Sequence, residues 1–311
     1  MITVYYNDRE AAAAEPITEP KPGSWISVIG PDELELDELA ESYGLDRDLL
    51  ADAVDIYEAP RLEKSGNQVY VYTRYCYPEG KEIATEPLLL ITTPDYLITV
   101  MRAQTDLLRP FTHGQNVEDG VVTTLRTHLL VQIMEEVNLS YERQIIQASK
   151  QILRFRSQLR QSQISNPAFV AIIELEEDLN EFVGALQPAG MLLTTLGSTK
   201  FLRLSEDDRE LLEDLRLGTN ELIELTKSRL LTLTNIRQAY DAIATNNLNN
   251  TFKRLTSIAI FLTIPTIIGG LFGMNVPVPW MHHHNAFIEV LIIIAICMAF
   301  TVAFFRKKRW F

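Results

Sequence analysis

Leu255–Phe272 reads LTSIAIFLTIPTIIGGLF, a stretch of 18 residues without a charged side chain. A second stretch, Ala286–Phe305, reads AFIEVLIIIAICMAFTVAFF and has Glu289 as its only charged residue. Because a helix needs about 20 apolar residues to cross the hydrocarbon of a bilayer, both stretches are predicted to span a membrane. The alternative is a buried helical hairpin in a soluble protein, which is disfavoured because both stretches are apolar on all sides.

The basic residues around the two stretches predict their orientation. The connecting segment, Gly273–Asn285, contains no lysine or arginine, whereas the far ends of the pair carry Lys253, Arg254, Arg306, Lys307, Lys308 and Arg309. Basic residues stay preferentially in the cytoplasm, so we expect a multi-pass protein of the cell (inner) membrane with both termini cytoplasmic. The loop over 274–285 is then outside, the basic tail over 306–311 is inside, and Trp280 and Trp310 are anchors at the two membrane surfaces.

The rest of the chain is acidic. The 311 residues carry 28 lysines and arginines against 41 acidic residues, a formal charge of −13. Residues 253–311 contain six of the basic and one of the acidic side chains, so residues 1–252 carry a net charge of −18. Such a body repels phosphate backbones, which argues against nucleic acid and favours cations as ligands. Cys76 and Cys297 are too few for a disulfide framework or a multi-cysteine zinc site.

The chain before the first span is predicted to form two cytoplasmic regions. Residues 1–120 are expected to be an α/β domain, with strands over 69–75, 88–92 and 96–101 and helices opening at 31–34 and spanning 46–54. Residues 121–204 are expected to be a long helical hairpin of Thr124–Gln163 and Ala168–Ser198, interrupted at Asn166-Pro167 and disturbed near Pro188 and Gly190.

One continuous helix is predicted over 205–273, so that a cytoplasmic stalk runs directly into the first span. Apolar residues recur at three- and four-residue steps, and no proline lies between Ser205 and Pro265. Such a helix is roughly 100 Å long and needs partners along its length, which predicts self-association. The alternative is two helices with a break at Asn246-Asn247 or Asn249-Asn250.

Gly273-Met274-Asn275 follows the first span directly, and NNLNNTFKRLT over 246–256 precedes it. This arrangement, with a long helix, an acidic body and a basic tail, resembles the CorA family of divalent-cation channels, the two-transmembrane Gly-Met-Asn superfamily. The resemblance implies a homopentamer with a funnel-shaped cytoplasmic body, an α/β/α sandwich-like domain and a pore lined by the first span. Two spans cannot enclose an aqueous path, so a channel requires several copies around an axis. The sequence has no phosphate-loop, His-Glu-x-x-His or Gly-x-Ser-x-Gly motif, so an enzyme is not expected.

The resemblance identifies Gly273, Met274 and Asn275 as a selectivity filter. Asn275 would supply a ring of amide oxygens at the outer mouth, with the two preceding residues shaping the turn. Magnesium gives up its water reluctantly, and neutral oxygens can hydrogen-bond the waters of the hydrated ion without stripping them. The alternative for Asn275 is a helix C-cap, a position that asparagine fills well.

The same resemblance places five residues along the pore: Asn249, Phe252, Leu255, Thr263 and Thr266. Phe252 stands where relatives often have methionine, and Thr263 where some have a larger apolar residue. Phe252 and Leu255 are expected to form a hydrophobic constriction that closes by dewetting. The alternative for Phe252 is packing against neighbouring helices. The alternative for Thr266 is that its hydroxyl hydrogen-bonds a backbone group that Pro265 leaves without a partner.

The outer loop departs from the family pattern. Many CorA proteins carry a Met-Pro-Glu-Leu-like segment there, whereas this chain reads VPVPWMHHHN over 276–285. The loop therefore lacks a carboxylate that would concentrate cations. The loop contains three adjacent histidines, His282, His283 and His284. Imidazole suits Zn²⁺, Co²⁺ or Ni²⁺, so these side chains are expected to recruit such an ion if several copies bring them together. The alternative is that the loop is simply polar.

Regulation by cytoplasmic Mg²⁺ is also implied by the resemblance. Asp214 lies at the distance from Asn249 that matches a regulatory carboxylate of the family. Asp207, Asp208, Glu210 and Glu213 lie near the same helix start. Carboxylates that face each other across an interface repel unless a hard cation bridges them. The alternative is a solvated helix N-terminus stabilised by the macrodipole.

The sequence thus predicts a channel for Mg²⁺ uptake, with Co²⁺ or Ni²⁺ as secondary ions, no cofactor, and Mg²⁺ as both substrate and regulatory ligand. Two alternatives stay open: a ZntB-like, proton-coupled Zn²⁺ transporter, and a membrane-anchored sensor or scaffold that conducts nothing.

Overall fold

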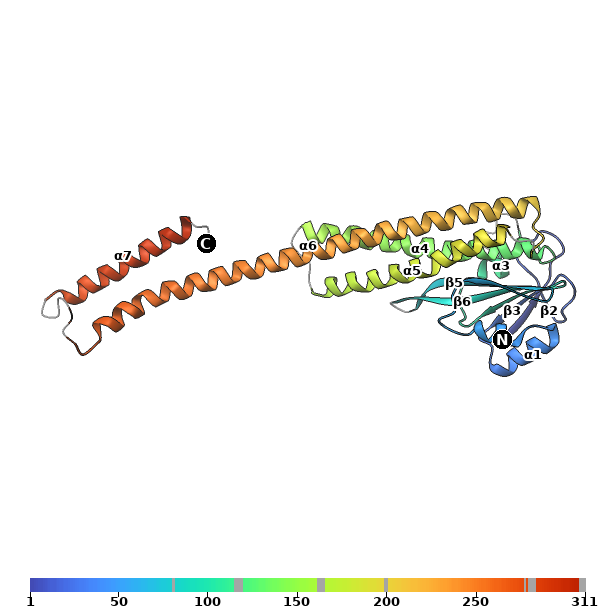
Figure 1. Cartoon of the computed structure of the whole chain (residues 1–311), viewed down its shortest axis with the longest axis horizontal. Helices are drawn as coiled ribbons and strands as arrows, with labels where there is room; N and C mark the ends of the chain where they lie inside the picture. Colours follow the sequence, from blue (N-terminus) through green and yellow to red (C-terminus); the bar gives the residue numbers. More distant parts are fainter. Residues whose placement is uncertain are drawn as a thin grey trace. The chain divides into compact units, whose positions relative to one another are not determined.

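The computed structural model describes residues 1–79, 82–114, 120–160, 166–198, 201–276, 278 and 284–307 (Figure 1). The chain divides into two compact units, Met1–Ile236 and Arg237–Phe311. The first unit contains a sheet and the helices that cover it, and the second contains the two apolar stretches.

A seven-stranded sheet forms the centre of the first unit. Its order is β2-β1-β3-β7-β6-β5-β4, and every neighbouring pair is antiparallel except β3 and β7. The strands are β1 (Ile2–Tyr5), β2 (Pro16–Ile17), β3 (Trp25–Ile29), β4 (Arg61–Ser65), β5 (Gln68–Glu79), β6 (Glu82–Thr92) and β7 (Leu97–Met101).

Alternation along the strands divides the buried side chains between two cores. In β6, Leu89 and Ile91 pack with helices α1 (Glu33–Tyr43) and α2 (Arg47–Asp52). Leu88 and Leu90 point to the other face, which is covered by the longer helices. Successive side chains of a strand point to opposite faces, so a sheet covered on both sides is apolar throughout. The domain is therefore the α/β/α sandwich that was predicted.

Local sequence signals explain the two small helices. Asp32 and Glu35 form a reciprocal capping box at the start of α1, and Gly44 ends it in the left-handed conformation with φ 62°. The Asp46 side chain accepts hydrogen bonds from the backbone N–H groups of Asp48 and Leu49 at the start of α2. Both helices lie where the sequence predicted them.

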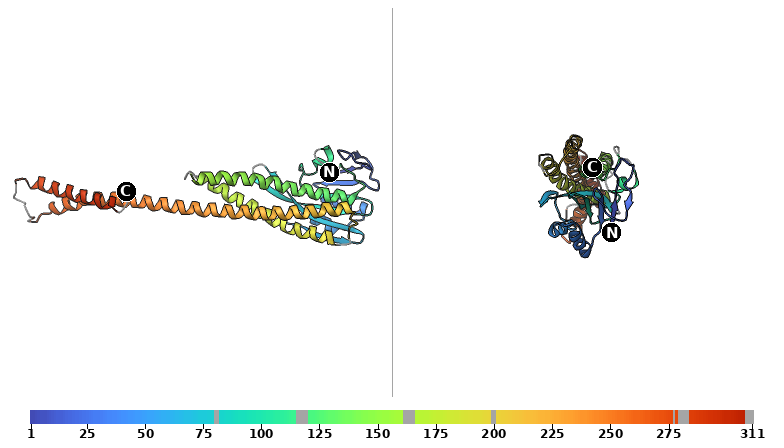
Figure 2. Two further views of the ribbon diagram at one scale, coloured as in Figure 1. Left: turned by 90° about the horizontal axis from the view of Figure 1, so that it is seen from above. Right: turned by 90° about the vertical axis from the view of Figure 1, so that its right-hand side faces the viewer.

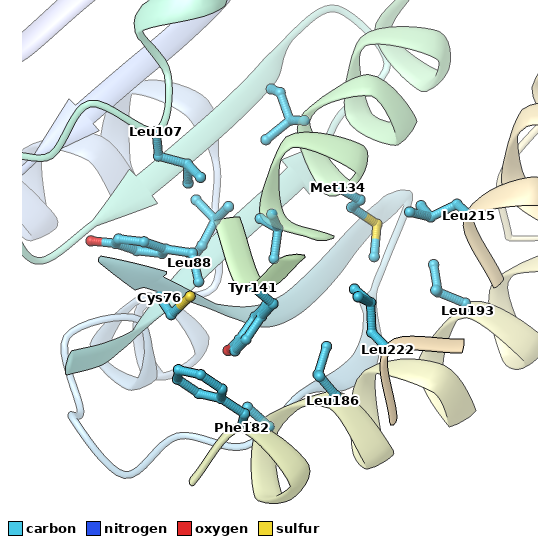
Figure 3. Packing of buried hydrophobic residues seen from close by; sticks show 14 of the residues in the cluster. Cys76, Leu88, Leu107, Met134, Tyr141, Phe182, Leu186, Leu193, Leu215 and Leu222 are labelled. Atoms are coloured by element: carbon cyan, nitrogen blue, oxygen red, sulfur yellow. The ribbon is translucent and has the colours of Figure 1, made fainter. Parts of the chain in front are cut away.

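The second core is built by α3 (Arg109–His113), α4 (Arg126–Arg160), α5 (Asn166–Ser198) and the first part of α6 (Glu206–Phe272). Helices α4, α5 and α6 lie side by side over the sheet (Figures 1 and 2). Tyr141 of α4 and Phe182 of α5 point toward each other in an edge-to-face pair with centroids 5.5 Å apart (Figure 3). Burial raises the pKa of Tyr141 well above its usual value, and raises that of the neighbouring Cys76 to about 12, so this thiol is unreactive.

The helix boundaries correct two details of the sequence analysis. Asn166 and Pro167 belong to α5, because proline is tolerated in the first turn of a helix, and α5 continues through Pro188. Helix α6 is continuous from Glu206 to Phe272, so the alternative of a break between 246 and 250 is wrong. The second unit is completed by α7 (Ala286–Lys307).

Candidate pore and regulatory sites

The second unit exposes an unusual amount of apolar surface. Both α6 and α7 contain a stretch that is long and apolar enough to cross a membrane. Only 6% of the residues in the stretch of α6, and 0% of those in the stretch of α7, are buried. Leu262 is 61% exposed and Phe300 is 73% exposed. Contiguous apolar surface on this scale requires a lipid or protein environment. The two predicted spans are thus present as helices that need such an environment.

Within its apolar stretch, each helix has one side that is less exposed than the other. In α7 the covered positions recur in pairs from Ala286 to Phe305 at three- and four-residue steps. In α6 the covered positions are Ser257, Phe261, Ile264, Pro265, Ile268 and Phe272. This spacing is that of two helices packed along one stripe each.

The five candidate pore residues lie on the opposite side of α6. At about 100° per residue, Asn249, Phe252, Leu255, Thr263 and Thr266 fall within an arc of about 120°, away from the covered stripe. All five are exposed. Thr256, Ala259 and Gly270 share this arc and Ile267 lies at its edge, so within the apolar stretch the arc carries mostly small and hydroxyl-bearing residues. Isoleucine, leucine and phenylalanine occupy most of the remaining surface. We call this arc the polar stripe.

Hydroxyl groups on the polar stripe are oriented by the backbone. Thr263 Oγ1 donates to the carbonyl of Ala259 at 2.7 Å, and Thr266 Oγ1 donates to that of Leu262 at 3.0 Å. The carbonyl that Pro265 frees belongs to residue 261, so Thr266 does not bond the group that the alternative assigned to it. Each hydroxyl oxygen keeps its lone pairs as acceptors toward the exposed side.

The Gly-Met-Asn segment begins where α6 ends. The N–H of Gly273 donates to the carbonyl of Gly269 at 3.0 Å, and that of Met274 to Leu271 at 3.4 Å. A Cβ at position 273 would lie 3.2 Å from the Gly269 oxygen, so glycine suits this tight turn. Asn275 lies three residues past the last helical residue and is exposed. It is therefore not the helix C-cap, and that alternative is wrong.

The outer loop and the tail are described only in part. His284 is exposed in the turn before α7, and the carbonyl of Asn285 accepts the N–H groups of Ile288 and Glu289. The remaining predicted residues of these two segments lie outside the described residues: Trp280, His282, His283, Lys308, Arg309 and Trp310.

The candidate regulatory carboxylates divide into two groups. Asp207, Glu210 and Asp214 are exposed and fall within an arc of about 60° on α6. Asp208 points elsewhere and is buried: its Oδ1 lies 2.9 Å from His128 Nδ1 of α4, and it forms a reciprocal capping box with Ser205. Asp208 thus stabilises the start of α6 and links it to α4 through His128.

Replacing Asp208 with alanine is expected to lower the free energy of unfolding by about 1–2 kcal/mol. The Asp208 carboxylate accepts the backbone N–H of Ser205, and loss of such a hydrogen bond costs about 1 kcal/mol; His128 loses its partner as well. Denaturant unfolding of the detergent-solubilised chain measures the effect, with Asp207→Ala as the exposed control, expected within about 0.5 kcal/mol of wild type. Equal destabilisation by both substitutions would contradict this role of Asp208.

Asp214 lines a groove of about 290 Å³ between α4 and α6. Leucines and Ile146 form its apolar part, and its acidic lining residues are Glu135, Glu142, Asp214 and Glu221. The sequence analysis missed the other three. Glu221 follows Asp214 by two helical turns, a signal readable from sequence, whereas the α4 glutamates depend on how the helices pack. Among the described residues, no three His, Cys, Asp or Glu side chains come together as a metal site.

The neighbouring Glu213 differs from Asp214. It faces another side of α6, where Arg216 Nε donates to it at 2.8 Å, and this hydrogen bond lowers the pKa of Glu213. Asp214 is therefore the member of this pair that faces the groove.

These features define a membrane protein with an α/β/α body, a long continuous helix and two C-terminal spans. The family model described as CorA-like Mg²⁺ transporter protein matches residues 21–307. The chain belongs to the CorA family of divalent-cation transporters, and is accordingly not an enzyme.

Individual relatives agree with this assignment. The cobalt/magnesium transport protein CorA of Methanocaldococcus jannaschii is 23% identical over 291 residues, which cover 92% of this chain and 90% of the relative. The complete structure of the CorA magnesium transporter from the same organism matches with a TM-score of 0.83 at 20% identity, covering 100% and 99% of the two chains. The ZntB cytoplasmic domain from Vibrio parahaemolyticus matches 78% of this chain and 98% of its own length, with a TM-score of 0.63 at 10% identity.

Proposed function

We propose that this protein is a homopentameric channel for passive Mg²⁺ uptake, with Co²⁺ and Ni²⁺ as secondary ions. The observation that carries the proposal is the polar stripe, which lies on the more exposed side of α6. An aqueous path needs such a surface from several copies, because one copy cannot enclose it. A membrane potential of 100 mV, negative inside, favours the entry of a cation by about 2.3 kcal/mol per elementary charge.

The proposal assigns each part of the chain a place. Residues 1–120 and 121–204 form the cytoplasmic body, and 205–273 form the stalk and the pore-lining span. The loop 274–285 is extracytoplasmic, residues 286–305 form the second span, and residues 306–311 form a basic cytoplasmic tail. This orientation is the one that basic residues favour in the inner membrane. Around a Cβ added at Gly269, no described atom beyond its chain neighbours and the nearby backbone of α6 lies within 4 Å, which leaves room for close approach of a neighbouring helix.

Selection of the ion is proposed to occur at Asn275. Five amide oxygens around an axis can accept hydrogen bonds from the first-shell waters of Mg²⁺. The ion then keeps its hydration, whose removal is costly for so small a cation. The exposed position of Asn275, beyond the end of α6, supports this assignment.

Gating is proposed to occur at Phe252 and Leu255. These side chains are 57% and 58% exposed and are the large apolar residues of the polar stripe near the cytoplasmic end of the first span. Rings of them can exclude water when the copies move together and admit it when they separate.

Regulation is proposed to depend on Mg²⁺ bound between copies at Asp214, with Asp207 and Glu210 on the same face. Support comes from the acidic groove that Asp214 lines, where carboxylates of a neighbouring copy would complete the shell of the ion. The bound ion favours the closed arrangement because it binds that arrangement more tightly.

Asp214→Ala is expected to remove the stabilisation of the pentamer by Mg²⁺. A ligand at 100 times its dissociation constant adds about 2.7 kcal/mol of stability, which a thermal unfolding scan detects readily. Glu213→Ala, on the other side of the helix, is the matched control and should keep the Mg²⁺-dependent shift. A shift of unchanged size in Asp214→Ala would contradict the regulatory assignment.

Flux into liposomes tests the transport proposal. Purified full-length protein should carry Mg²⁺ at a rate that follows the membrane potential and does not require a proton gradient. If Zn²⁺ is carried in preference and only with a proton gradient, the ZntB-like alternative replaces the proposal. Zn²⁺ should be tested in the same vesicles, because His284 is exposed just before α7 and imidazole is a good ligand for this ion. If the vesicles carry no divalent cation at all, the alternative of a non-conducting sensor or scaffold would replace the proposal.

A further inference from the structure

Glu289 is a charged residue that the proposed pore does not use. It is the only Asp, Glu, Lys or Arg in residues 255–305, a stretch that includes both spans and the outer loop. Charged residues within spans are costly and are commonly functional. The net formal charge of this stretch is therefore −1 per copy, with histidines neutral.

The structure puts this charge at the outer end of α7 and away from its lipid-exposed side. Glu289 lies in the first turn of α7 and is half-buried on the covered stripe of that helix, between the exposed Ile288 and Leu291. The carbonyl of Asn285 accepts its backbone N–H at 3.1 Å, which places Glu289 within the first hydrogen-bonded turn. A carboxylate in the first turn of a helix interacts favourably with the positive end of the helix dipole.

We propose that Glu289 supplies the negative charge of the outer mouth and raises the local concentration of divalent cations there. The inference rests on the proposed pentameric channel. The loop 273–285 has no acidic residue, so the copies of Glu289 are the source of formal negative charge on this side. Five such charges around one axis create a potential that acts twice as strongly on a divalent as on a monovalent cation.

This role is one of electrostatic steering and differs from ligation. A charge at the mouth acts over about a Debye length, roughly 10 Å at 0.1 M salt, and needs no direct contact with the ion. It should therefore change the concentration at which uptake is half-maximal and leave the maximal rate unchanged. A carboxylate that serves only the helix dipole would change stability and neither transport parameter.

The test compares wild type, Glu289→Gln and Glu289→Asp as full-length protein in liposomes, at ionic strengths of about 0.02 and 0.2 M. Glu289→Gln should raise the external Mg²⁺ concentration for half-maximal flux about three- to tenfold at the lower ionic strength, and its half-saturation should no longer depend on salt. Glu289→Asp, which keeps the charge, should resemble wild type. Size-exclusion chromatography and thermal unfolding establish that each variant is assembled and folded.

Two results would overturn the inference. One is an unchanged half-saturation and salt dependence in folded Glu289→Gln; the other is a reduced maximal flux with unchanged half-saturation. Wild-type protein without Mg²⁺ flux would instead overturn the proposed function, so the two failures are distinguishable.

Discussion

Asn275→Ala is expected to abolish Mg²⁺ uptake while leaving assembly and membrane insertion intact. Each copy contributes one amide, and a hydrogen bond to a water of the ion is worth about 1 kcal/mol net. Loss of five such bonds corresponds to about 5 kcal/mol, or more than a thousandfold in rate. Asn275 is exposed and lies outside the helix, so its removal has little effect on folding.

The measurement is uptake of Mg²⁺ by liposomes containing equal amounts of assembled protein. Asn250→Ala is the control, because Asn250 is an exposed asparagine of α6 that lies about 100° around the helix axis from Asn249 and outside the polar stripe. It should transport as wild type does. Comparable flux through Asn275→Ala would exclude an amide ring as the filter.

Leu255→Asn is expected to produce a channel that leaks when wild type is closed. A polar side chain at the proposed constriction keeps the narrow segment hydrated, so dewetting no longer blocks the ion. At cytoplasmic Mg²⁺ concentrations that close wild type, we expect flux at least about tenfold higher, equivalent to about 1.4 kcal/mol in the barrier.

Leu255→Met provides the control for this substitution, since methionine keeps the constriction apolar at a similar volume. The flux of this variant should fall with rising cytoplasmic Mg²⁺ as it does in wild type. If Leu255→Asn also remains closed, the barrier lies at another position of α6.

Much of the architecture could be predicted because its signals are local. The absence of charge over 255–272 was sufficient to predict the first span, and the basic residues that flank the two spans predicted their orientation. The continuity of α6 followed from a long segment without proline. The capping residues Asp32 and Asp46 marked the starts of α1 and α2.

Parts of the sheet could not be predicted because they depend on long-range pairing. Strand β4 reads RLEKS, which has no strand pattern of its own, and it is held by its pairing with β5 and by ion pairs of Arg61 with Asp52 and Glu63. Strand β3 lies parallel to β7, more than 60 residues away; β2 at the edge of the sheet has only two residues, and β1 beside it has four.

The candidate site shows the same division. The family resemblance predicted Asn249, Leu255 and Thr266 as pore residues, and the helix places all three on one side of α6. The covered stripe on the opposite side, and the groove that Asp214 shares with Glu142 of α4, depend on helix packing that no local pattern contains. The pairing of His128 with Asp208 likewise joins residues 80 positions apart.

An experimental structure of the full-length protein in lipid nanodiscs tests the central claim most directly. The account predicts five copies around one axis, with the amide of Asn275 from each copy facing a water-filled opening at the extracytoplasmic end and α7 on the outside of the ring. A dimer without a central opening, or an assembly in which the Asn275 amides face lipid, would contradict it.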